Sequence, residues 1–86
     1  MNKVKIKIPE FSLSEGMSYH WENDFEIESK IEDGVIKIIA NKAGLISLAN
    51  HFLNLAQDEI PFGHHLHFDQ YNSLEDSSVE IIIEKK

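Results

Sequence analysis

The run NKAGLISLANHFLNLAQDE, residues 41–59, gives the chain a hydrophobic period of helical spacing. Its apolar side chains recur at i, i+3, i+4, i+7, i+8 and i+11, which predicts one broad apolar face packed on the rest of the protein. These side chains are Leu45, Leu48, Ala49, Phe52, Leu53 and Ala56. The polar side chains expected on the opposite, solvent-facing side are Ser47, Asn50, His51, Asn54 and Gln57.

The two ends of this helix are marked by residues with known end preferences. Asn41 can accept a hydrogen bond from a first-turn amide and so cap the helix. The turn-forming residues DEIPFG should end it near Gln57. Gly44 costs about 0.5–1 kcal/mol relative to alanine inside a helix, so we expect its missing side chain to allow close approach to the sheet.

The residues before the helix alternate between apolar and polar, which is typical of strands. Lys3 to Pro9 (KVKIKIP) predicts a half-buried strand that ends at the proline. Ser12 to Gly16 reads as a loop, and residues 17–22 could begin another strand or continue the loop. Residues 24–32 alternate again, and Asp33-Gly34 predicts a type I′ hairpin turn to VIKIIA, residues 35–40. VIKIIA is apolar on both faces except at Lys37, so we expect a central strand.

Two more strands are expected after the helix, in HHLHFD (residues 64–69) and SVEIIIEK (residues 78–85). The side chains whose parity predicts a core-facing position are Leu66, Phe68, Val79, Ile81 and Ile83. The order of strands, helix and C-terminal hairpin predicts an α+β fold. In that fold, a single antiparallel β-sheet carries one α-helix packed on one face. At 86 residues we expect one domain, residues 1–86.

Composition narrows the function classes. The chain has no cysteine, which excludes disulfides and thiolate metal sites. It has fifteen carboxylates against eight lysines, no arginine and a formal net charge of −7, so nucleic-acid binding is not expected. The basic side chains stop at Lys42 and resume at Lys85, and this acidic stretch favours a basic protein partner. The sequence lacks a signal peptide or an apolar membrane span, so we expect a cytoplasmic protein.

The histidine-rich strand supplies the candidate binding residues. If Leu66 and Phe68 face the helix, the alternate residues face away from it, onto the open side of the sheet. The predicted binding residues from both C-terminal strands are His65, His67, Asp69, Glu80, Ile82 and Glu84. Polar and ionisable groups around an exposed Ile82 are typical of a recognition surface. A solvated sheet face without any partner is the alternative.

The sequence is also compatible with metal binding, hydrolysis or homodimerisation. His65 and His67 lie on one strand face, as two zinc ligands could, with Asp69, Glu80 or Glu84 as a third ligand. No HExxH motif, nucleophile elbow or glycine-rich phosphate loop is present, so we predict no catalytic activity and no cofactor. A histidine-based metal-binding protein or small hydrolase is the second hypothesis. Homodimerisation through a strand edge or the open sheet face is a third.

The second half of the chain resembles small bacterial immunity proteins that accompany polymorphic (contact-dependent) toxins. Three pieces carry the resemblance: the L-x-x-L-A helix of Leu45, Leu48 and Ala49, an H-x-H-aromatic-Asp strand, and an S-x-E-aliphatic strand. The residues of the two strands are His65, His67, Phe68 and Asp69, and then Ser78, Glu80 and Ile81 to Ile83. The resemblance implies a non-catalytic α+β protein that binds and blocks a cognate toxin. A basic toxin such as a nuclease would suit the acidic surface.

Overall fold

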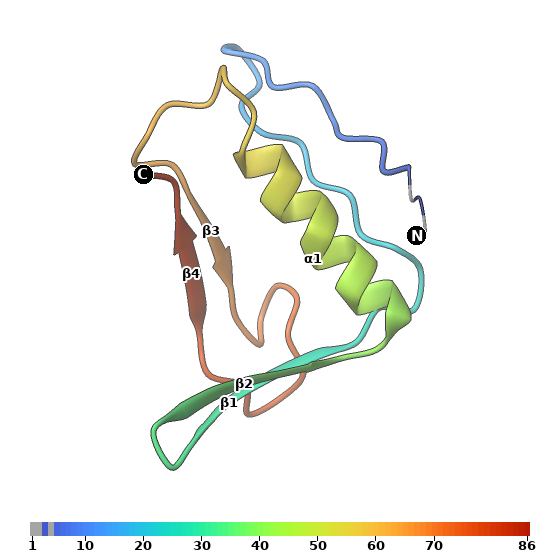
Figure 1. Cartoon of the computed structure of the whole chain (residues 1–86), viewed down its shortest axis with the longest axis vertical. Coiled ribbons are helices and arrows are strands. Elements are labelled where there is room, and N and C mark those ends of the chain that lie inside the picture. Colours follow the sequence, from blue (N-terminus) through green and yellow to red (C-terminus); the bar gives the residue numbers. More distant parts are fainter. Residues whose placement is uncertain (1–2, 4) are drawn as a thin grey trace.

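The computed structural model describes residue 3 and residues 5–86 of the chain (Figure 1). Its elements are β1 (Ile27–Glu32), β2 (Val35–Ala40), α1 (Lys42–Leu55), β3 (His65–Phe68) and β4 (Ile81–Glu84). The predicted α+β class and the order of strands, helix and C-terminal hairpin are confirmed. The predicted single sheet is not: β1 pairs with β2 and β3 pairs with β4, each as a separate two-stranded antiparallel sheet.

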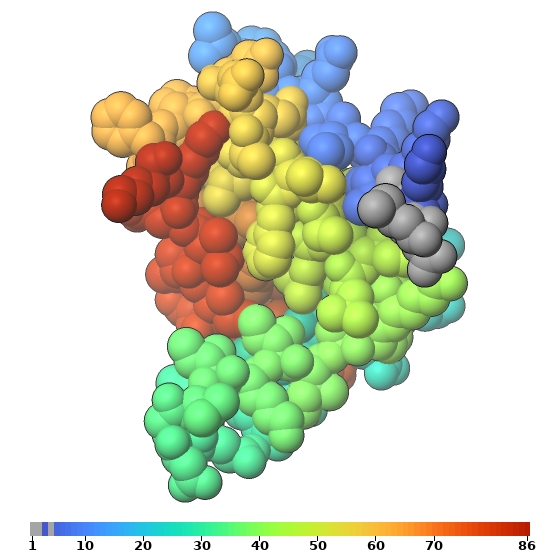
Figure 2. Space-filling model, in the orientation of Figure 1, coloured from blue at the N-terminus to red at the C-terminus, as the bar shows by residue number. Residues whose placement is uncertain are grey.

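The β1–β2 hairpin forms where the turn chemistry predicts it. Asp33 and Gly34 have φ values of 51° and 77°, the positive φ that both central positions of a type I′ turn require. Glu32 and Val35 are the first pair of the ladder, and Ile27 and Ala40 are the last. The hairpin protrudes from the rest of the molecule (Figure 2).

A loop on the outer edge of β1 explains why the two hairpins do not merge into one sheet. The backbone N–H groups of Glu75 and Val79 donate to the carbonyls of Ile27 (2.8 Å) and Ser29 (3.0 Å). The Ser78 hydroxyl accepts from the Ser29 N–H at 3.1 Å, and the Ser29 hydroxyl donates to the Val79 carbonyl. Residues 75–79 thus satisfy the edge of β1 as a loop, and β4 begins only after them.

The strand predicted at Lys3 to Pro9 is absent from the described residues of that segment, and Val4 lies outside the described residues. Residues 17–22 are also not a strand, whereas Ser12 to Gly16 forms the expected turn, closed by a bridge between its two end residues. Residues 5–22 instead run along one side of α1, with β3 and β4 on the other (Figure 1). A chain held beside a helix has no neighbouring strand with which to form a ladder.

Helix α1 begins and ends close to the predicted residues. The Asn41 side chain accepts from the Gly44 N–H at 2.8 Å, so the predicted N-cap is confirmed. Gly44 is buried, and a Cβ added there would lie 2.5 Å from the Glu26 carbonyl oxygen. The close approach expected at this glycine is therefore present, and it joins the first turn of α1 to the start of β1.

The predicted orientation of α1 is wrong. Of the six apolar residues expected to face the core, only Leu48 is buried, and Leu45, Phe52 and Leu53 are 58%, 44% and 46% exposed. The buried side of the helix is mostly polar and comprises Gly44, Ser47, Leu48, Asn50, His51, Asn54 and Leu55. The polar side is buried because it hydrogen-bonds the N-terminal segment.

Those hydrogen bonds connect helix side chains to backbone groups. Asn50 Nδ2 donates to the Lys7 carbonyl (2.9 Å), and Asn54 Nδ2 donates to the Ser18 carbonyl (2.6 Å). Gln57 Nε2 donates to the Pro9 carbonyl (3.0 Å), and the Ser47 hydroxyl accepts from the Glu22 N–H (2.8 Å). Each bond satisfies a backbone group that a strand ladder would otherwise have satisfied.

Strand β2 is an exposed edge strand, which corrects the prediction of a central one. Residues 35–39 are all exposed, and Ile36 is 72% exposed. Within the part of the chain that the structure describes, β2 pairs only with β1. Its other edge therefore presents free N–H and C=O groups between apolar side chains.

The core lies between α1, β1 and the inner face of the β3–β4 hairpin. Its buried apolar residues are Ile27, Leu48, Leu55, Ile60, Leu66, Phe68 and Leu74, with Ile81 and Ile83 packed against them. The predicted core-facing position of Val79 is wrong, because this residue precedes β4 and is exposed. No helix in the described part of the chain is long and apolar enough to cross a membrane.

Candidate functional site

The β3–β4 hairpin separates its side chains as the period of two predicts. Leu66 and Phe68 are 2% and 3% exposed, whereas His65 and His67 are exposed. His67 lies opposite Ile82 in the ladder, and His65 lies opposite Glu84. We call His65, His67, Asp69, Glu80, Ile82 and Glu84 the outer hairpin face. Five of these six side chains are exposed, and Asp69 is partly buried.

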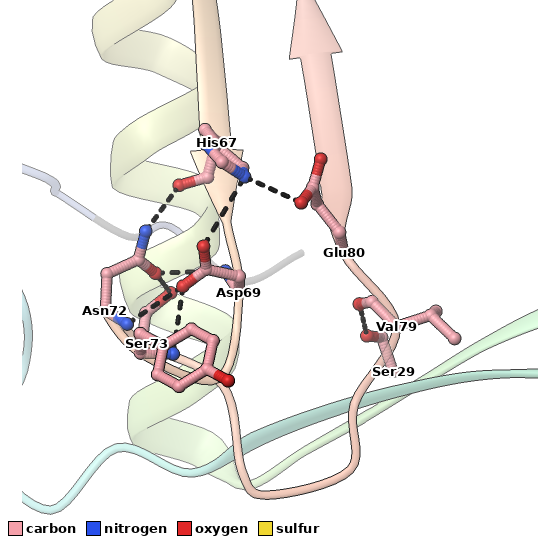
Figure 3. Close-up of polar contacts among 8 residues, drawn as sticks. Ser29, His67, Asp69, Asn72, Ser73, Val79 and Glu80 are labelled. Carbon is pink, nitrogen blue, oxygen red and sulfur yellow. Dashed lines mark hydrogen bonds and ion pairs between the residues drawn. The ribbon is translucent and has the colours of Figure 1, made fainter.

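Three of the six residues come together at one end of the outer hairpin face. Asp69 immediately follows β3 and Glu80 immediately precedes β4, so both lie beside His67. Nε2 of His67 is 3.1 Å from a Glu80 carboxylate oxygen and 3.5 Å from Oδ2 of Asp69 (Figure 3). We call His67, Asp69 and Glu80 the histidine–carboxylate cluster.

The loop after β3 holds Asp69 in place. Oδ1 of Asp69 accepts from the backbone N–H of Tyr71 (2.9 Å) and of Asn72 (3.1 Å). Asn72 Nδ2 in turn donates to the carbonyl of His67 at 3.0 Å (Figure 3). These bonds use one carboxylate oxygen of Asp69 and leave Oδ2 facing His67.

The other residues of the outer hairpin face stand apart from the cluster. Among the described residues, His65 and Glu84 form no ion pair, although they are paired in the ladder. Ile82 is 56% exposed and lies beside His67, so an apolar side chain adjoins the charged cluster. The face thus combines an acidic group, an imidazole group and an apolar group.

A cavity of about 290 Å³ lies beside β3, all four of whose residues line it. It is lined by Tyr19, Trp21, His51, His65, Leu66, His67, Phe68 and Asn72. His65 and His67 therefore contribute both to the outer hairpin face and to this cavity. The cavity was not predictable from the sequence, because Tyr19, Trp21 and His51 are distant from β3 in the chain and form no recognisable motif.

His51 is the buried histidine of that lining, which corrects the prediction that it is exposed. It is 1% exposed, and its ring stacks on Tyr19 and packs against Trp21 at a centroid distance of 4.1 Å. Nδ1 lies 2.7 Å from the Ser47 carbonyl and so carries the proton, whereas Nε2 has no hydrogen-bond partner among the described residues. Burial lowers the pKa of His51 below its usual 6.5, which favours the neutral ring.

A comparison with protein families gives one match. Residues 35–86, which include β2, α1 and the whole β3–β4 hairpin, match the family model described as Immunity protein 32. No curated protein and no solved structure gives a significant match to the chain.

Proposed function

The chain belongs to the Immunity protein 32 family, and from this we propose that it neutralises a cognate bacterial toxin by direct protein–protein binding. The family match is the observation that carries the proposal. In this proposal residues 1–86 act as one non-catalytic domain in the cytoplasm and bind a toxin of the polymorphic class.

We further propose that the outer hairpin face contacts the toxin. It lies within the matched region, and it surrounds the exposed Ile82 with the ionisable side chains of His67, Glu80 and Glu84. Interfaces commonly pair a central apolar contact with a polar rim. The helix side of the same hairpin is committed to the core through Leu66 and Phe68, so only the outer face is free to bind.

The charge of this region favours a basic partner. Between Lys42 and Lys85 the chain has no lysine or arginine, and its carboxylates include Asp69, Glu80 and Glu84. Such a surface accelerates encounter with a positively charged protein. A nuclease, which must itself be basic to hold a phosphate backbone, fits this description.

The test uses the purified protein and the toxin encoded by the adjacent gene. We expect a stable 1:1 complex by size-exclusion chromatography and calorimetry, and loss of toxin activity on addition of the protein. Failure of the wild-type protein to bind the product of any neighbouring gene would contradict the proposed function.

A set of variants locates the interface. Ile82→Glu and Glu80→Lys should weaken the complex at least about tenfold, because central contacts typically cost more than 1 kcal/mol when disrupted. Asp58→Lys, which makes the same charge reversal on the exposed turn after α1, is the matched control and should bind normally. Normal binding by all three variants would be consistent with the proposed function, but it would contradict the assignment of the interface to the outer hairpin face.

Self-association is a separate proposal supported by β2. Its outer edge has no backbone partner among residues 3 and 5–86, and the exposed apolar side chains of Ile36 and Ile38 lie along this strand. Antiparallel pairing of β2 with β2 of a second copy would join the two hairpins into one four-stranded sheet and satisfy these groups.

A further inference from the structure

The geometry of the histidine–carboxylate cluster points to a site for a divalent transition-metal ion, and we propose that His67, Asp69 and Glu80 bind Zn²⁺. The ligands belong to the outer hairpin face, but zinc binding requires no toxin, so the proposal is testable on the isolated protein.

The spacing of the ligand atoms fits a tetrahedral ion. Zinc bonds of about 2.0–2.1 Å to nitrogen and oxygen place neighbouring ligands of a tetrahedron about 3.3–3.4 Å apart. Nε2 of His67 lies 3.1 Å from Glu80 and 3.5 Å from Asp69, which bracket this value. One ligand atom from each of the three residues lies within 4.8 Å of the others, so a small movement of exposed side chains would close the site.

The ligand types select the metal. An imidazole nitrogen with two carboxylate oxygens suits zinc and its neighbours in the first transition row, whereas Mg²⁺ and Ca²⁺ prefer oxygen ligands alone. Three protein ligands are also the number found at zinc sites that keep a position open for water or another ligand. The exposure of His67 and Glu80 leaves that fourth position accessible from solvent.

The protein holds the ligands before any ion binds. Oδ1 of Asp69 is fixed by two backbone N–H groups, so Oδ2 is directed to the site at little additional entropic cost. The ladder pairs His67 with Ile82 and so fixes its distance from Glu80 across the hairpin. No lysine lies between residues 43 and 84 of the sequence, so the basic neighbour of the two carboxylates within the hairpin is the His67 ring, and a dication would neutralise their charge more completely.

The experiment is zinc titration of the tag-free protein by calorimetry, with equilibrium dialysis to measure stoichiometry. The wild type should bind one Zn²⁺ per chain, and millimolar Mg²⁺ should not displace it. His67→Ala and Glu80→Gln should each weaken binding at least about tenfold. Asp69→Asn, whose amide oxygen can still accept the two backbone hydrogen bonds, should also weaken it.

The matched controls are His65→Ala and Glu84→Gln, which remove the same functional groups from the same face two or more residues away. Both should bind zinc like the wild type. Circular dichroism of each variant identifies any that fail to fold, and the ring nitrogen chemical shifts of His67 and His65 on zinc addition report the ligand directly.

Two results would overturn the proposal. One is the absence of stoichiometric zinc binding by the wild type, which would leave the cluster as ion pairs alone. The other is an equal loss of binding in His65→Ala and His67→Ala, which would assign the metal to a different histidine set. A protein that binds zinc as described but no toxin would retain this inference and contradict only the proposed function.

Discussion

His51 is a titratable side chain enclosed by aromatic rings, and this gives the stability of the protein a pH dependence. Burial disfavours the charged imidazolium, so the folded-state pKa of His51 lies below its usual 6.5. In the unfolded chain the same ring titrates near 6.5. The unfolded chain therefore binds more protons than the folded protein as the pH falls below about 6.5.

We predict that the contribution of His51 to stability is complete above about pH 6.5 and is lost as the pH falls toward the folded-state pKa. Each unit below 6.5 lowers the free energy of unfolding by up to about 1.4 kcal/mol. His51→Phe should remove this slope and also the unpaired Nε2 atom. Urea unfolding from pH 7.5 to 5 measures it.

The control for His51 is His65→Ala, which removes an exposed imidazole instead of a buried one. A slope in His51→Phe equal to that of the wild type would show that His51 does not titrate on unfolding.

Sequence reasoning predicted the position of His67 but not that of His51. The side of a strand that a residue faces follows from a period of two, and β3 obeys it. The buried face of a helix is harder to predict, because another segment of the chain can pack on its polar side. The rings that enclose His51 come from Tyr19 and Trp21, some thirty residues earlier. Apolar periodicity alone carries no information about such a partner.

At the scale of elements, the polar side of α1 binds the N-terminal segment. Asn54 is 1% exposed and donates to the Ser18 carbonyl at 2.6 Å. Its Oδ1 also accepts from Gln57 Nε2, which donates to the Pro9 carbonyl. Asn54 therefore binds Ser18 directly and helps to position the Gln57 amide that binds Pro9.

We predict that Asn54→Ala lowers the free energy of unfolding by about 1–3 kcal/mol, because two partly buried hydrogen bonds lose a partner. Amide hydrogen exchange should accelerate most in residues 5–22, where the lost contacts lie. Asn23→Ala, at an exposed asparagine, is the control and should change stability by less than about 0.5 kcal/mol. Uniform acceleration over the whole chain would show that the segment does not open separately.

The elements themselves were largely predictable, and their packing was not. The Asp33-Gly34 turn, the Asn41 cap and the C-terminal hairpin follow from local rules that act within a few residues. The first predicted strand fails because residues 5–9 lie beside a helix instead of another strand, although the sequence from Lys3 to Pro9 alternates as a strand should. A local sequence pattern predicts which side chains of a segment share a face, but it does not predict which element that face packs against.

At the scale of the whole molecule, the edge of β2 and the outer side of α1 remain apolar and exposed. Ile36 and Ile38 line the edge, and Phe52 and Leu53 lie on the helix. An unpaired apolar edge strand is a site where another chain can add a strand.

We predict that the wild type self-associates at micromolar to millimolar concentration and that Ile36→Lys with Ile38→Lys shifts it toward monomer, because charges on an edge oppose strand addition. Sedimentation equilibrium measures the change. Leu13→Lys, at a residue 93% exposed in the N-terminal turn, is the control and should leave the association unchanged. A monomeric wild type at all concentrations would contradict the proposal of a dimer through β2.

The hydrogen bonds from α1 and Gln57 to the carbonyls of residues 7, 9 and 18 affect how sequences of this kind can diverge. The side-chain amides donate to backbone carbonyl oxygens, which every amino acid has. Substitutions in that segment can therefore accumulate without loss of these hydrogen bonds. We therefore expect relatives to keep side-chain amides at positions 50, 54 and 57 and to vary more in the N-terminal segment that these amides bind.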